Sequence, residues 1–201
     1  MTLLGVTKTV PVEQIRAAIA LGLTDLGENR VQEAEAKAAD LPAVAWHLVG
    51  HLQSNKAGRA VELFEQIHSV DSIDLARRLS RLATAAGRTP LPVYLEVNVD
   101  RDPHKSGMAV SDLERALPEL VTLPGLELRG LMTVGRLVSN PEDTRPTFAA
   151  LRGLSDRMSA SQPRLGSGLS MGMSDDFEIA VEEGATVVRI GRAIFGERPS
   201  L

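Results

Sequence analysis

The chain has 201 residues, no cysteine, and 22 basic against 26 acidic side chains, which give a formal net charge of −4. The lack of cysteine excludes disulfides, thiol catalysis and cysteine-ligated zinc. The mixed charges and the scarcity of aromatic side chains argue against nucleic-acid binding. No apolar run is long enough to cross a membrane and no signal peptide opens the chain, so we expect a cytoplasmic protein without membrane contact.

Short apolar runs that predict β-strands alternate with amphipathic patterns that predict helices. The expected strands cover residues 3–6, 24–26, 45–49, 67–70, 92–97, 126–133, 168–171 and 186–190. A helix or a helical turn follows each of them, and no linker divides the chain. A single domain is therefore expected over residues 1–201.

Several residues predict where the helices begin and end. Pro11 opens the first helix and Gly22 ends it. Ser72 is expected to cap the helix after the fourth strand. Ser111 and Glu114 have the spacing of a capping box, which predicts the start of the helix after the fifth strand.

Eight such units predict an α/β protein with a (β/α)8 TIM-type barrel. An open doubly wound sheet is the alternative, but eight units with short loops in a chain of this length favour closure. The chain begins almost at its first strand, so we expect the outer ring to lack a helix at the N-terminus. An uncovered strand exposes apolar surface, which predicts a partner or a missing segment.

Lys8 directly follows the first expected strand. Burial penalises an ammonium group and lowers its pKa, so a lysine at the end of a buried strand can attack a carbonyl as the free amine. A solvated lysine is the commoner outcome for this segment alone. At the other end of the chain, residues 187–196 predict a strand, a turn at Gly191 and a helix start, which together can hold a phosphate. The two features together suggest pyridoxal 5'-phosphate (PLP).

Polar side chains follow most of the expected strands, and the carboxyl ends of the strands form the active site in a barrel of this kind. These residues are Lys8, Asn29, His51, Gln53, Asn55, Lys56, Asp71, Asn98, Lys105, Ser106, residues 170–174, Gly191 and Arg192. Asn29 also fits an ordinary helix cap together with Gln32. No cysteine or carboxylate completes a zinc site with His47 and His51, so no metal is expected. His47 and His68 are expected in or near the barrel interior.

Several motifs together match a known family. They are VTKT at 6–9, GENRVQE at 27–33, WHLVGHLQSNK at 46–56, KSG at 105–107, LRGLM at 128–132, LSMGMSDD at 169–176 and VRIG at 188–191. With these motifs in this order and spacing, the chain resembles the pyridoxal phosphate homeostasis proteins, formerly called proline synthetase co-transcribed homologues. Their barrel is similar to the barrel domain of bacterial alanine racemase.

The resemblance implies a set of residues that bind PLP. They are Lys8, Asn29, Ser170, Arg189, Gly191 and Arg192. Lys8 would carry PLP as a Schiff base, and Ser170 with the amides of Gly191 and Arg192 would hold the phosphate. Arg189 would lie near the pyridine nitrogen or the phosphate, and Asn29 near the ring. The family usually has a helix before the lysine strand and a small hydroxyl residue at the position of Arg192, and this sequence departs from both patterns.

The resemblance further implies a monomeric protein of PLP homeostasis that stores and delivers the cofactor without substantial turnover, with PLP-dependent apo-enzymes as candidate recipients. An arginine facing the ring nitrogen leaves that nitrogen unprotonated, because arginine does not give up its proton. Racemisation also needs acid–base groups on both faces of the substrate carbon, and the sole tyrosine, Tyr94, lies within the fifth expected strand. A PLP-dependent amino-acid racemase of low activity is the first alternative. An aldolase that acts on sugar phosphates through a lysine Schiff base is the second.

Overall fold

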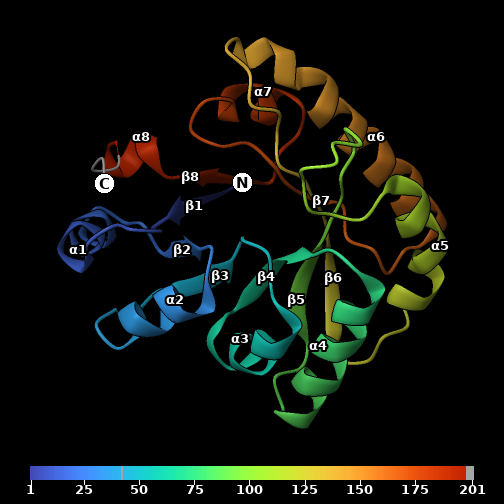
Figure 1. Cartoon of the computed structure of the whole chain (residues 1–201), viewed down its shortest axis with the longest axis horizontal. Helices are drawn as coiled ribbons and strands as arrows, with labels where there is room; N and C mark the ends of the chain where they lie inside the picture. Colours follow the sequence, from blue (N-terminus) through green and yellow to red (C-terminus); the bar gives the residue numbers. More distant parts are fainter. Residues whose placement is uncertain (42, 198–201) are drawn as a thin grey trace.

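The computed structural model describes residues 1–41 and 43–197, in which eight parallel strands close into a barrel (Figure 1). The strands are β1 (Thr2–Val6), β2 (Asp25–Glu28), β3 (Ala45–Leu48), β4 (Gln66–Val70), β5 (Leu91–Glu96), β6 (Leu126–Met132), β7 (Gly168–Ser170) and β8 (Val187–Ile190). β1 pairs with both β2 and β8, and this pairing closes the ring. The predicted barrel is confirmed, and the open sheet is wrong.

Helices follow the strands and surround them. The α-helices are α1 (Val12–Ala20), α2 (Val31–Ala38), α3 (Ala57–Leu63), α4 (Ile73–Ala85), α5 (Val110–Leu120), α6 (Arg145–Ser161), α7 (Phe177–Glu182) and α8 (Arg192–Phe195). Two 3-10 turns, η1 (Ser54–Lys56) and η2 (Pro141–Thr144), precede α3 and α6. In the described part of the chain, no helix is both long and apolar enough to cross a membrane.

The helix signals in the sequence agree with the structure, with one exception. The hydroxyl of Ser72 accepts a hydrogen bond from the Leu75 amide at 3.3 Å and caps α4 as predicted. The predicted capping box of Ser111 and Glu114 is wrong, because α5 already begins at Val110 and both residues lie inside it. After the bridge of Met108 to Val97 at the end of β5, one extended residue, Ala109, precedes the helix.

Two separate cores hold the barrel together. The larger one lies between the strands and the apolar faces of the helices, such as Phe148 and Leu151 of α6. The smaller one joins Leu4 of β1 to Tyr94 of β5 and Met132 of β6. Since β1 and β5 are not neighbours in the ring, their contact crosses the barrel interior. The rest of that interior is largely polar.

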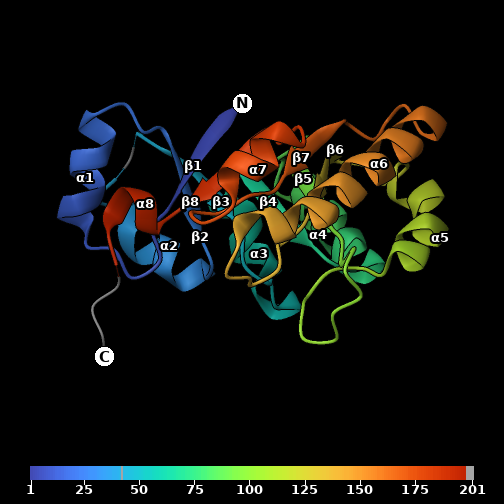
Figure 2. The same ribbon diagram turned by 90° about the horizontal axis from the view of Figure 1, so that it is seen from above.

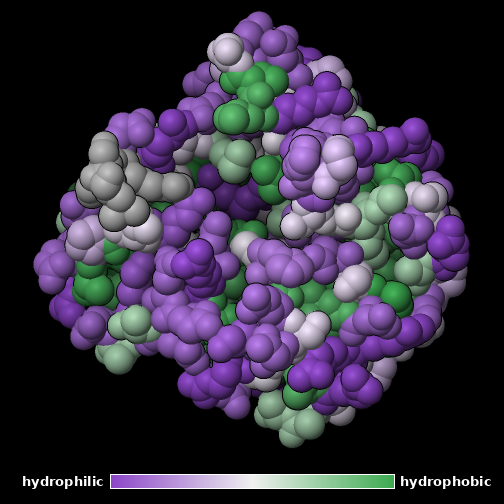
Figure 3. Space-filling model, in the orientation of Figure 1, coloured by the Kyte–Doolittle hydropathy of each residue, from purple (hydrophilic) through white to green (hydrophobic). Residues whose placement is uncertain are grey.

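The loops at the two ends of the barrel differ in size. In Figure 2 the N-terminus lies on one side of the barrel, and the long yellow-green loop between β5 and α5 projects from the other. Figure 3 shows a hollow near the middle of one face, with hydrophilic side chains at its bottom. The carboxyl ends of parallel strands meet at one end of a barrel, so the polar residues that follow the strands gather there.

Candidate cofactor site

Lys8 lies just beyond the carboxyl end of β1 and is partly buried. Side chains alternate along a strand, and Leu4 points into the barrel, so Val6 shares its inward-facing series and Lys8 follows in the turn after the strand. The amide of Thr7 donates to the Gly27 carbonyl at 2.9 Å, which pins the backbone before the lysine to β2. The predicted lysine is therefore at the mouth of the barrel.

A buried ion pair supports the backbone next to Lys8. Glu28 is fully buried and accepts hydrogen bonds from Thr7 Oγ1 at 2.8 Å and from Lys37 Nζ at 2.6 Å. Lys37 Nζ also donates to the Thr7 carbonyl at 2.6 Å. Burial raises the pKa of Glu28, and the Lys37 ammonium opposes that rise. Lys37 thus binds both Glu28 and the backbone of Thr7. Because Lys8 follows Thr7 in the sequence, these bonds also fix the position of the Lys8 backbone.

One cavity joins the two ends of the chain. It has a volume of about 180 Å³, and Lys8, Gly191 and Arg192 are among its lining residues. β1 and β8 are paired neighbours, which brings residues that are far apart in sequence to one place. The barrel closure therefore unites the predicted lysine with the predicted phosphate-binding turn.

The amides at the start of α8 converge on one hydroxyl group. Gly191 N and Ala193 N both donate to Ser174 Oγ, each at 3.3 Å. The side chain of Arg192 pairs with Asp175, and Arg192 is one of the residues that line the cavity. Two amide donors and a hydroxyl beside a lysine-lined cavity are a donor set that suits a phosphate, so these residues fit PLP.

Arg189 and Ser170 lie deeper, inside the barrel. Arg189 Nη1 donates to the Ser170 carbonyl at 2.7 Å and to Ser170 Oγ at 3.0 Å, and Nη2 donates to the Thr133 carbonyl at 2.8 Å. Burial lowers the pKa of Arg189 to about 10, while the carboxylates of Glu96 and Asp176 oppose this change. The guanidinium therefore remains charged at neutral pH.

The structure divides the six predicted residues among three places. Lys8, Gly191 and Arg192 line the cavity, whereas Arg189 and Ser170 bind each other in the interior. Asn29 follows β2, and its backbone packs so closely on Gly50 that an added Cβ there would lie 2.5 Å from the Asn29 carbonyl oxygen. This close packing places Asn29 at the rim between β2 and β3.

Glu96 is a buried acid at the same end of the barrel that the sequence analysis did not single out. It ends β5, is 5% exposed, and shares an inward-facing series with Tyr94. Burial and the nearby Asp71 carboxylate raise its pKa to about 7, against the attraction of Arg189 and His51. His51 is itself bonded to Asp71 at 2.7 Å. The sequence signal for Glu96 was its position two residues after Tyr94 in the same strand, which puts both side chains on one face.

Glu96→Gln is expected to remove part of the pH dependence of folding stability. With a folded pKa of about 7 against 4.5 for the ordinary group, the stabilisation is complete below pH 4.5 and is lost as the pH rises through 7. This loss amounts to roughly 3 kcal/mol. Urea unfolding at pH 5 and pH 8 should show the variant gaining stability over the parent protein only at pH 8.

Glu114 is exposed on α5, so Glu114→Gln is the matched control for this measurement. Its difference in stability from the parent protein should be the same at both pH values. Burial lowers the pKa values of His47 and His68, which gives a pH dependence of opposite sign below pH 6.5. That contribution is common to the variant and the parent and cancels in their difference. An equal difference at pH 5 and pH 8 would contradict the role of Glu96.

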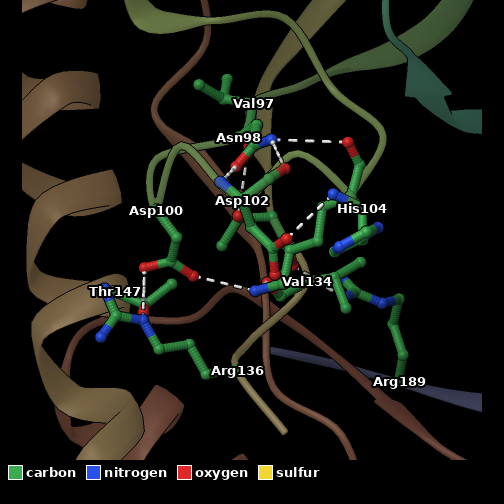
Figure 4. A network of polar contacts seen from close by, with 11 residues as sticks. Val97, Asn98, Asp100, Asp102, His104, Val134, Arg136, Thr147 and Arg189 are labelled. Atoms are coloured by element: carbon green, nitrogen blue, oxygen red, sulfur yellow. Dashed lines mark hydrogen bonds and ion pairs between the residues drawn. The ribbon is translucent and has the colours of Figure 1, made fainter.

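A second polar cluster ties together the loops that rim the mouth. Asp100 accepts from Arg136 Nε at 2.9 Å and from Thr147 Oγ1 at 2.7 Å, as Figure 4 shows. Lys105 Nζ donates to Asp100 at 2.9 Å and to the Val134 carbonyl at 3.1 Å. The loops after β5 and β6 are thereby fastened to each other and to α6.

Comparison with known proteins identifies the family of the chain. The family model described as "Alanine racemase, N-terminal domain" matches residues 2–199, which defines the chain as a barrel of the alanine racemase type. A pyridoxal phosphate homeostasis protein of Pseudomonas aeruginosa is 45% identical over 199 residues, covering 98% of this chain and 84% of the relative. One of Aquifex aeolicus is 42% identical, with 98% and 86% coverage. The chain belongs to the pyridoxal phosphate homeostasis protein family.

Solved structures show the same fold. PipY of Synechococcus elongatus with PLP bound has a TM-score of 0.91 and 45% identity, covering 98% of this chain and 92% of that one. Alanine racemase of Clostridium difficile has a TM-score of 0.82 at 14% identity, covering 100% of this chain and 53% of that one. The second likeness concerns the fold alone, whereas the first includes a relative whose structure holds PLP.

Proposed function

We propose that this protein holds PLP as a Schiff base on Lys8 and serves PLP homeostasis without substantial turnover. The observation that carries the proposal is the cavity lined by both Lys8 and the first turn of α8. The relatives are named for PLP homeostasis, and the PipY structure contains PLP. Bound PLP supplies an aldehyde that reacts with amines and a ring that accepts electrons.

Each predicted residue receives a role in this proposal. Lys8 supplies the amine, and the amides of Gly191 and Arg192 with the hydroxyl of Ser174 hold the phosphate. Arg189 provides a buried cation in the barrel interior, with Ser170 fixing its position. Asn29 stands at the rim, where it limits the space beside the ring.

The arrangement of the interior argues against efficient racemisation. That reaction needs a second proton carrier opposite the lysine. Tyr94 is buried, stacks on His68 with ring centroids 4.7 Å apart, and bonds through its hydroxyl to Thr186. Thr186 precedes β8 and therefore lies at the amino end of the barrel, far from the mouth. The sole tyrosine thus points away from Lys8.

The alternative function is a weak PLP-dependent amino-acid racemase, and Glu96 is the observation that favours it. Its pKa of about 7 suits proton transfer near neutral pH. Appreciable racemisation by the loaded protein would overturn the carrier proposal. An aldolase for sugar phosphates has less support, because the relatives are named for PLP.

Direct detection of the lysine adduct tests the proposal. The purified protein incubated with PLP should become yellow, and borohydride should bleach the colour and fix the cofactor on the peptide that contains Lys8. Peptide mass mapping identifies the modified lysine among the four in the sequence. Label on another lysine, or no label, would refute the assignment.

We also propose that the protein is a cytoplasmic monomer and that PLP-dependent apo-enzymes receive the cofactor. The exposed mouth beside Lys8 supports delivery, since residues that line the cavity, such as Gly196 and Glu197, are solvent-exposed. The recovery of activity of an apo-enzyme after mixing with the loaded protein, compared with equimolar free PLP, measures this transfer.

Ser174→Ala is expected to weaken PLP binding by about 10-fold to 100-fold, which corresponds to a lost hydrogen bond to a charged group. Binding of pyridoxal, which lacks the phosphate, should remain unchanged, because Ser174 faces the amides of Gly191 and Ala193 rather than the lysine. Titrations of both ligands by absorbance give the two affinities. A parallel loss for pyridoxal would place Ser174 outside the phosphate site.

A further inference from the structure

A line of hydrogen bonds crosses the barrel interior and ends at Arg189. Its donor–acceptor distances are 3.0 Å from Arg189 Nη1 to Ser170 Oγ and 2.8 Å from Ser170 Oγ to His68 Nδ1. It continues with 3.0 Å from His68 Nε2 to His47 Nδ1 and 3.1 Å from His47 Nε2 to Asp25 Oδ1. We call these five residues the interior chain. It leads from the cofactor end of the barrel to the amino end of β2.

With both imidazoles neutral, the carboxylate end of the interior chain determines the direction of the bonds in it. A guanidinium only donates and a carboxylate only accepts, so Arg189 donates to Ser170 and His47 Nε2 donates to Asp25. A neutral His47 then has a bare Nδ1, which accepts from His68 Nε2. A neutral His68 likewise has a bare Nδ1, which accepts from the Ser170 hydroxyl. For two neutral rings this arrangement of protons satisfies all four bonds.

The burial of the two rings supports this arrangement. His68 is fully buried and His47 is 6% exposed. Burial lowers the pKa of both rings, and the charge of Arg189 lowers that of His68 further. A proton added to His47 Nδ1 would remove the acceptor for His68. The Gln66 side-chain oxygen, 2.9 Å from His68 Nε2, is a second acceptor for the same proton.

We propose that His47 and His68 are positioning residues for Arg189, and through it for the cofactor. The hydroxyl of Ser170 donates to His68 Nδ1, which leaves the lone pairs of Ser170 Oγ to accept from Arg189. The carbonyl oxygen and Oγ of Ser170 both accept from Nη1 of Arg189. Thr133 holds Nη2 from the other side. The inference rests on the proposed role of Arg189. It adds β3 and β4, which carry His47 and His68, to the elements that position the Arg189 guanidinium.

Nuclear magnetic resonance of the protein without PLP tests the proton arrangement by itself. Long-range ¹H–¹⁵N spectra distinguish the two neutral imidazole tautomers from each other and from the charged ring. We expect the Nε2–H form for His47 and His68 throughout pH 6.5–8, with assignments from His47→Gln and His68→Asn. An Nδ1–H or a charged ring at either position would overturn the inference.

Two substitutions of His68 test the positioning role. His68→Leu removes the acceptor for Ser170, and we expect PLP affinity to fall about tenfold and the absorbance maximum of the bound cofactor to move. His68→Asn keeps an acceptor close to the Nδ1 position and should restore both values. The exposed His104→Gln, outside the interior chain, is the matched control. Equal affinity and an unmoved maximum in His68→Leu would overturn the inference.

These experiments distinguish a failure of the proposed function from a failure of the inference about the interior chain. Loss of PLP binding in the parent protein would refute the proposed function, while the tautomers of the free protein still report on the interior chain. If His68→Leu does not fold, the comparison of His68→Asn with His47→Leu replaces it, because His47→Leu removes the acceptor for His68 one bond further from Arg189. A move of the absorbance maximum in His47→Leu but not in His68→Asn supports the inference, and no difference between them opposes it.

Discussion

Lys8→Ala is expected to abolish the covalent attachment of PLP completely. The variant lacks the lysine amine that lines the cavity shared with Gly191 and Arg192. The phosphate-binding groups remain, so PLP can still bind, but without a covalent bond and in an exchangeable form. We expect the Schiff-base absorbance to be lost, no label after borohydride, and loss of all PLP on dialysis.

Lys56→Ala is the matched control for this substitution, because Lys56 also follows a strand at the mouth and is partly buried. Of the remaining lysines, Lys37 is paired with Glu28 and Lys105 with Asp100, so replacing either would also disturb a structural contact. The control should keep the absorbance and the borohydride label. Schiff-base absorbance retained in Lys8→Ala would mean that a different lysine carries the cofactor.

Gly130→Ala is expected to destabilise the fold by more than about 4 kcal/mol, or to prevent folding. Gly130 has a φ of +150° inside β6, and an added Cβ would lie 1.9 Å from the carbonyl oxygen of Gly168 on β7. The atoms it meets belong to the backbone of a neighbouring strand, so no side-chain rearrangement can relieve the clash. The β5–β6 register also shifts at this position.

Gly58→Ala is the control for this prediction. Gly58 lies in α3, and an added Cβ there meets nothing within 4 Å. Alanine in place of glycine inside a helix stabilises by roughly 0.5–1 kcal/mol, so this variant should be at least as stable as the parent. The urea midpoints of Gly130→Ala and Gly58→Ala test this prediction. Similar midpoints for the two variants would show that β6 and β7 can move apart.

The fold was predictable because local patterns repeat eight times. Apolar runs marked every strand, and Ser72 and Gly22 marked helix ends where the structure has them. The pattern at Ser111 misled because a capping box and the first turn of a helix contain the same residue types. The true start of α5 follows the bridge from Val97 to Met108, a contact that no local pattern describes.

The candidate site was predictable only in part. Motifs at the two ends of the chain indicated Lys8 and Gly191, and the closure of the barrel brings them together. Ser174 was one of two serines in the polar segment 170–174, and only the fold shows that it meets the α8 amides. Glu96 and the interior chain depend on contacts between strands far apart in sequence. His68 and Ser170, for example, are 102 positions apart.

The division of the barrel into an apolar outer core and a polar interior has a consequence for how such proteins diverge. Most of the burial that stabilises the ring lies in the shell between the strands and the helices. Side chains inside the ring can therefore be exchanged at moderate energetic cost, provided that their hydrogen bonds are replaced in sets. One scaffold can in this way acquire a new interior chemistry while its outer architecture stays the same, as expected for a shape that pyridoxal phosphate homeostasis proteins share with alanine racemase.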